Sequence, residues 1–119
     1  MTRPSIAGGA SFDLAKLDGE LRKEAAYAES GYRSRTLVRE PDLRVVLTIM
    51  RSGARIANHH ADETASIHNL SGRLRLHLPD EPCDLEAGKL LALEAGVRHD
   101  VEALEQSAFL LTIGWRDRR

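Results

Sequence analysis

Hydrophobic and polar residues alternate with a repeat of two along much of this chain. Every second residue is Leu, Val or Ile in the stretches 43–50 and 73–78, beginning at Leu43 and at Leu74. Because successive side chains of a β-strand point to opposite sides, this repeat predicts a strand in each stretch. We expect the face of Leu43 and Ile49, and that of Leu74 and Leu78, to pack on a core. The residues between them should face mostly water.

Two other runs are apolar almost throughout, residues 90–93 (LLAL) and 108–113 (AFLLTI). Both are predicted to be strands with both faces buried. Turn-forming residues separate the runs, among them Pro41, Gly53 and Gly72. Many short strands at a spacing of about 8–12 residues favour a sandwich or a barrel.

The first part of the chain has a different pattern. Leu14, Leu17 and Leu21 fall roughly on one face of a helix, so we predict a helix over residues 12–28. Ser11 is its expected N-terminal cap, and Gly19 is the position at which it would break most easily. The chain is therefore divided into an N-terminal arm and helix, residues 1–34, and a β-domain, residues 35–119.

Composition and charge limit the class of protein, its partners and its compartment. Its 119 residues, 42% hydrophobic and 29% charged, are typical of one globular domain. A net charge of −1 gives no electrostatic attraction to nucleic acid or to an anionic membrane, and no run approaches the ~20 apolar residues of a membrane span. The single Cys83, expected in an exposed turn, cannot form a disulfide within the chain and fits a reducing compartment. We expect a cytoplasmic protein that binds neither nucleic acid nor membranes.

Glycine and histidine recur at fixed spacings in the β-domain. The stretch 53–72 contains Gly53, His59 and Gly72, and the stretch 88–103 contains Gly88 and His99. Together they resemble the paired signature of the cupin superfamily. The resemblance implies an all-β fold, the double-stranded β-helix of a cupin jelly-roll barrel (RmlC-like), here with a short N-terminal helical extension. It also implies that the functional site lies in the barrel interior.

The resemblance further implies where a metal would bind. In the family, two His and a Glu from the first stretch and a His from the second hold one divalent metal. His59 and His99 stand at two of these positions, whereas Ala61 and Ala65 stand at the other two. The adjacent His60 is a substitute ligand. We predict that His59, His60 and His99 line the ligand site and would hold a divalent metal such as Zn, Fe, Ni or Mn.

Other interpretations of these residues stay open. His60, Asp62 and Glu63 could form only a polar loop at the barrel mouth. His99 could be a buried histidine, hydrogen-bonded to a backbone carbonyl or to Asp100. Four arginines would either bind an acidic ligand or simply face solvent: Arg55, Arg73, Arg75 and Arg98.

These residues predict a small-molecule-binding cupin, with anions among its possible ligands and with or without a metal. The alternative is a metal-dependent cupin enzyme of the dioxygenase or isomerase type. A third hypothesis is a metal-free enzyme whose histidine acts as general base, oriented by Asp62 or Asp100. The sequence identifies no catalytic residue and no substrate.

A homodimer is also predicted. The expected outward face of residues 44–50 carries Val46 and Met50, and the run 108–113 is apolar on both faces. A lone small barrel would leave part of this surface wet, and symmetric pairing is the usual remedy.

Overall fold

The computed structural model describes residues 8–60 and 62–114, except for the side chains of Asn58 and His59. Two helices come first, α1 (Leu14–Arg22) and α2 (Ala25–Ser30). Nine strands follow within the described residues: β1 (Tyr32–Glu40), β2 (Leu43–Met50), β3 (Arg55–His59), β4 (Ala65–Ser71), β5 (Arg73–His77), β6 (Pro82–Glu86), β7 (Leu90–Leu93), β8 (His99–Ala103) and β9 (Ser107–Gly114).

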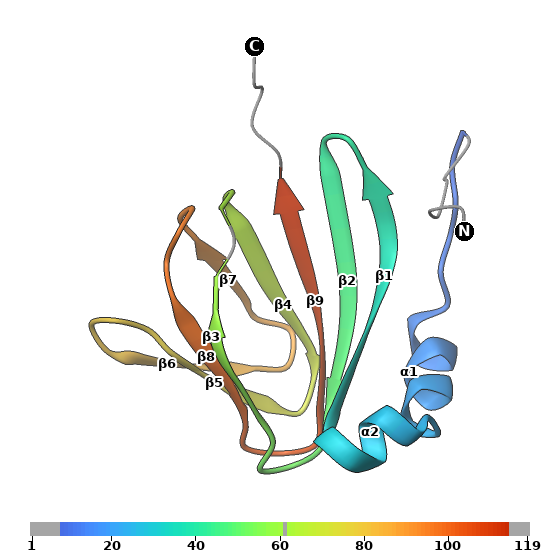
Figure 1. Cartoon of the computed structure of the whole chain (residues 1–119), viewed down its shortest axis with the longest axis horizontal. Helices are drawn as coiled ribbons and strands as arrows, with labels where there is room; N and C mark the ends of the chain where they lie inside the picture. The colour runs from blue at the N-terminus through green and yellow to red at the C-terminus, as the bar shows by residue number, and fades with distance from the viewer. Residues whose placement is uncertain (1–7, 61, 115–119) are drawn as a thin grey trace.

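The strands form two antiparallel sheets that face each other. One sheet has the order β1-β2-β9-β4-β7 and the other the order β3-β8-β5-β6. Figure 1 shows the two sheets close together at the bottom of the view and diverging toward the top. The predicted all-β double-stranded β-helix with an N-terminal helical extension is confirmed, although the two sheets do not join into a closed barrel.

The main hydrophobic core lies between the sheets. Leu74 and Leu76 of β5 are fully buried there, together with Ile67 of β4 and Phe109 of β9. Arg73, which alternates with them, is exposed. The period-two prediction for residues 73–78 is therefore confirmed, because one face of β5 is buried in the core and the other is partly exposed to solvent.

The prediction for β2 assigned its two faces wrongly. Leu47 and Ile49 are buried, but they pack with Leu21 of α1 in a second cluster outside the five-stranded sheet. Val46 and Met50, expected to face water, turn instead toward the core between the sheets. The physical reason is that the N-terminal helices cover the outer face of the sheet, as Figure 1 shows, so that both faces of β2 are shielded.

The two apolar runs differ in their burial. In β9, Ala108 packs on the helix side and Phe109 on the core side, so both faces are covered as predicted. In β7 the prediction is wrong, because Leu90 is 60% exposed. Among the described residues β7 pairs with β4 alone, so it is an edge strand with less cover.

The prediction for Cys83 is also wrong. Cys83 was expected in an exposed turn, but it lies on β6 and is half-buried against the core.

The helical region begins later than predicted and breaks at another place. Asp13, not Ser11, caps α1, because its carboxylate accepts a hydrogen bond from the Lys16 N–H at 3.1 Å. The helix ends at Arg22, beyond Gly19. Gly19 is tolerated within the helix, where no neighbouring atom approaches the position of a side chain.

No helix in the described part of the chain is long and apolar enough to cross a membrane.

Candidate functional site

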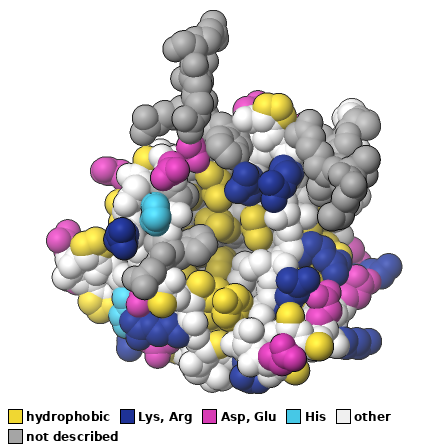
Figure 2. Space-filling view, viewed as in Figure 1, with side chains coloured by type: hydrophobic (Ala, Val, Ile, Leu, Met, Phe, Trp, Pro, Cys, Tyr) yellow, Lys and Arg dark blue, Asp and Glu magenta, His cyan; other side chains and the backbone are white. Residues whose placement is uncertain are grey.

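A cavity of about 610 Å³ opens between the two sheets. Figure 2 shows apolar side chains in this hollow, with basic side chains to its right and histidine to its left. The volume is within the usual range of small-molecule sites, roughly 300–1,000 Å³. Different strands supply polar and apolar parts of its wall.

The polar wall comes from β1 and β2. Their inward residues include Ser34, Thr36 and Thr48, with Arg39 and Arg44 nearer the turn that joins the strands. The antiparallel register places Ser34 opposite Thr48, and their hydroxyl groups hydrogen-bond at 2.7 Å. The same register places Arg39 opposite Arg44. Two adjacent strands thus present hydroxyl groups in the interior and two guanidinium groups toward one end.

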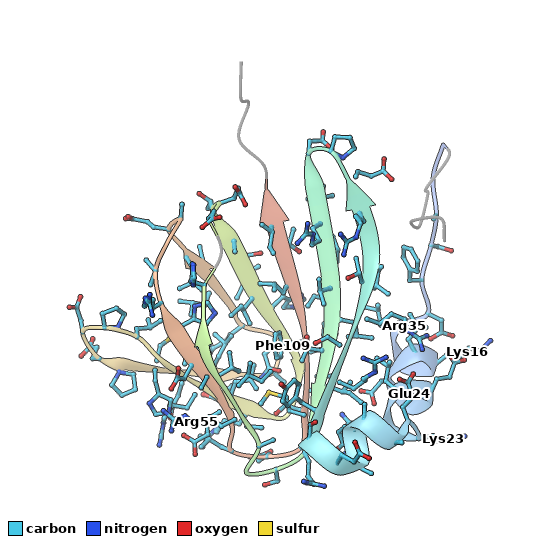
Figure 3. All side chains as sticks on the ribbon, viewed as in Figure 1. Lys16, Lys23, Glu24, Arg35, Arg55 and Phe109 are labelled. Carbon is cyan, nitrogen blue, oxygen red and sulfur yellow. The ribbon has the colours of Figure 1, made fainter. Side chains whose placement is uncertain are left out.

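The apolar wall comes from β9 and β4. Phe109, Leu111 and Ile113 line the cavity at every second position of β9, and Ile67 adds to them from β4. In Figure 3 Phe109 lies between the sheets, whereas Arg55 lies at the periphery of the molecule. The cavity can therefore bury a hydrophobic group beside its polar wall.

His99 comes from β8 in the opposite sheet and is 5% exposed. Its Nδ1 lies 3.2 Å from the backbone oxygen of Val97. A carbonyl oxygen only accepts hydrogen bonds, so Nδ1 carries the proton, and Nε2 of the neutral ring is an acceptor. The hydrogen bond to a backbone carbonyl is one of the two expected from the sequence.

His60, Asp62 and Glu63 also line the cavity. The His60 Nε2 and Asp62 Oδ1 atoms are 3.9 Å apart, too far for a hydrogen bond, and the two side chains are 46% and 83% exposed. Glu63 differs from them because it is only 7% exposed. The loop is thus polar and largely wet at His60 and Asp62, and it places one buried carboxylate at the cavity.

The backbone of His59 lies beside that of His99, since the two residues are partners in the β3–β8 register. The structure therefore brings His60 and His99 into one cavity lining and places the His59 backbone next to them. The role of these three residues in ligand binding stays a prediction.

The described residues do not assemble a metal site. Ala65 is buried on β4 and its methyl group offers no donor atom, while Ala61 lies outside the described residues. Within the part of the chain that is described, no group of three or more His, Cys, Asp or Glu side chains is placed to hold a metal ion. The Asp100 carboxylate, one of the two proposed to orient a histidine, bonds to Arg55 at 2.8 Å.

Three of the arginines proposed as anion ligands form ion pairs on the four-stranded sheet. Arg55 pairs with Asp100, Arg73 with Glu86, and Arg75 with Asp84. Hydrogen bonding to Asp84 raises the pKa of Arg75, and the same contact lowers the pKa of the Asp84 carboxyl. Arg98 is exposed and does not line the cavity.

The sequence reasoning missed Arg39 and Arg44, which do line the cavity. A usable signal was present in the chain. The two residues are spaced symmetrically about the Pro41-Asp42 turn, so a tight hairpin there places them opposite each other. The sequence did not show that the face of β2 that carries Arg44 points into the cavity.

A family model described as "Cupin domain" matches residues 45–114. That range contains the strands β3 to β9 and nearly all of β2, including most of the cavity wall. No curated protein sequence matches the chain.

Several solved structures share the fold. A conserved protein of unknown function from Streptococcus pyogenes is 24% identical with a TM-score of 0.76, over 99% of this chain and 98% of that one. A cupin 2 conserved barrel domain protein from Leptotrichia buccalis is 26% identical with a TM-score of 0.73, over 87% of this chain and 47% of that one. A mutant salicylate 1,2-dioxygenase from Pseudoaminobacter salicylatoxidans is 15% identical with a TM-score of 0.77, over 87% of this chain and 34% of that one.

Proposed function

This chain belongs to the cupin family, and we propose that it binds a small organic molecule in the cavity between its two sheets. The observation that carries the proposal is the division of the cavity wall. Hydroxyl and guanidinium groups from β1 and β2 stand beside apolar side chains from β9 and β4. Small-molecule sites combine a mostly apolar lining with a few convergent polar groups in this manner.

Each part of the wall has a distinct role in this proposal. Phe109 and Leu111 bury the apolar part of the ligand, which supplies most of the affinity. His99 accepts a hydrogen bond through Nε2 and helps to fix the orientation of the ligand. His60 stands nearer to solvent and contacts the exposed end, and His59 is the third predicted contact.

Two neighbouring substitutions on β2 test the proposal. Val46 lines the cavity, whereas Val45 is half-buried and does not. Val46→Phe should fill part of the cavity, and Val45→Phe is the matched control because it makes the same change on the opposite face. The probe is benzyl alcohol, and binding is followed by NMR shifts of the Ile67 and Leu111 methyl groups.

We expect saturable shifts in the unmodified protein and in Val45→Phe, and at least about tenfold weaker binding in Val46→Phe, since a blocked pocket loses the contacts of a whole ring. Equal binding by all three proteins, or binding without shifts of these methyl groups, would contradict a ligand site in the cavity. The thermal unfolding curve of each variant shows that it is folded.

The second candidate function is a metal-dependent cupin enzyme of the dioxygenase or isomerase type. One observation favours it, the register that pairs the backbones of His59 and His99. His59, His60 and His99 would be the ligands of a divalent Zn, Fe, Ni or Mn ion, and a salicylate dioxygenase is among the proteins of similar fold.

Metal analysis of protein purified without a histidine tag separates the two functions. About one equivalent of a transition metal that is lost in His99→Gln would support the enzyme, because a catalytic metal usually keeps at least three protein ligands. A content far below one equivalent that is the same in His99→Gln is the result expected for a metal-free binding protein.

A further inference from the structure

We propose that the ligand is a small carboxylic acid with an apolar body, and that Arg39 and Arg44 hold its carboxylate at one end of the cavity. This inference rests on the proposed function and names the class of molecule that the cavity accepts. It follows from the placement of the two arginines, the charges around them and the composition of the rest of the wall.

The sheet holds the two guanidinium groups next to the apolar wall. Arg39 pairs with Arg44 across β1 and β2, Arg44 pairs with Ile113 of β9, and Ile113 pairs with Ala65 of β4. Side chains directly opposite each other in antiparallel strands lie on the same face, about 5 Å apart at their Cβ atoms. The row therefore places two cations and a branched apolar side chain in succession along the cavity wall, and the buried methyl group of Ala65 follows them. A ligand can contact the cations with one end and the apolar residues with the other.

Arg39 and Arg44 place two positive charges side by side at this end of the cavity, and this charge favours an anion there. In Figure 2 basic side chains stand beside the hollow on the side of the five-stranded sheet. A bound carboxylate has the right charge and shape, because its two oxygens match the paired N–H groups of a guanidinium.

The acidic residues of the cavity do not exhaust the hydrogen-bonding capacity of the two arginines. Asp62 is mostly in water, with a side chain 83% exposed, so solvent screens its charge. Glu63 is buried and offers two oxygens. The two guanidinium groups carry about ten N–H donors between them, more than one carboxylate can accept. Glu63 alone therefore cannot accept from all of these donors, even where it contacts one of the arginines.

The apolar side of the wall argues for an apolar body and against an inorganic anion. Next to the arginines, this side consists of Ile67, Phe109, Leu111 and Val101, among others. Strongly hydrated anions would lose their water there without replacement.

Benzoate and benzamide test the inference, because they have the same shape and differ in charge. Methyl NMR titrations of Ile67 and Leu111 should show benzoate binding at least about tenfold more tightly than benzamide, as expected for a charge-assisted bidentate contact. Arg39→Gln and Arg44→Gln should each reduce this preference to about twofold or less. Arg75→Gln removes the same charge from the outer ion pair with Asp84 and should leave the preference unchanged.

Arg39 is exposed, so Arg39→Gln remains an informative variant even where Arg44→Gln fails to fold. Equal affinity for benzoate and benzamide, or a preference that survives both Gln variants, would overturn the carboxylate inference and leave the proposed cavity site standing. If none of benzoate, benzamide and benzyl alcohol shifted the two methyl resonances, the cavity site itself would be overturned.

Discussion

Leu76 and Arg75 are neighbours on β5 whose side chains meet opposite environments. Leu76 is fully buried in the core, and Arg75 pairs with Asp84 at 2.7 Å on the partly exposed face. Leu76→Ala should lower the free energy of unfolding by about 2–5 kcal/mol, because it leaves a cavity in a packed core. Arg75→Ala should lower it by less than about 1 kcal/mol, since exposed ion pairs contribute little. Urea unfolding of both variants measures the two values, and equal losses would contradict the assignment of the faces.

At the scale of single residues, the sequence predicts alternation well and the identity of the covered face poorly. Leu74 and Leu76 are in the core because their face is the only apolar one. In β2 both faces carry apolar residues, so the repeat alone does not say which of them meets the cavity. This is why Arg44 was missed as a cavity residue, whereas His99 was expected there from the family spacing and His60 from its place next to His59.

At the scale of elements, Glu24 ties the helical extension to the first strand. Its carboxylate accepts hydrogen bonds from Arg33 at 2.6 Å and from Arg35 at 2.9 Å, and Figure 3 shows Glu24 and Arg35 together beside α1. The hydrogen bond from Arg33 lowers the pKa of Glu24 below its ordinary value of 4.5. The ionised form therefore stabilises the folded state, and this contribution is lost as pH falls through the lowered pKa.

Glu24→Gln should lower the melting temperature at neutral pH, and the difference from the unmodified protein should begin to shrink near pH 4.5 and vanish at lower pH. Thermal unfolding followed by circular dichroism over this pH range measures the effect. The control is Glu29→Gln, which removes the same charge from an exposed position on α2. A difference for Glu24→Gln that does not change with pH would contradict the role of its ionised carboxylate.

The bounds of these helices show what the sequence could not determine. A helix was predicted over residues 12–28 from the spacing of Leu14, Leu17 and Leu21, and helices do form in that region. The break falls at Lys23 and Glu24, between α1 and α2. Glu24 meets its two arginine partners there, and these contacts come from another element, which a local pattern does not contain.

At the scale of the whole molecule, the homodimer remains a prediction, but the surface expected to form it changes. Val46 and Met50 cannot contribute, because they turn inward, and α1 covers the outer face of β2. The most exposed large apolar side chain among the described residues is Leu90, on the edge strand β7. An edge strand with an exposed leucine can pair with its copy across a two-fold axis, which hides the apolar side chain and the open backbone groups.

Light scattering coupled to size-exclusion chromatography should therefore give twice the chain mass of 13.2 kDa at micromolar concentration. Leu90→Lys should shift the protein to the single-chain mass, because a charge placed on an edge strand opposes pairing. Arg98→Glu, an exposed charge change on the loop before β8, should leave the mass unchanged. A single-chain mass for the unmodified protein would contradict the dimer. A dimer that persists in Leu90→Lys would place the interface elsewhere on the surface and reject the role of β7.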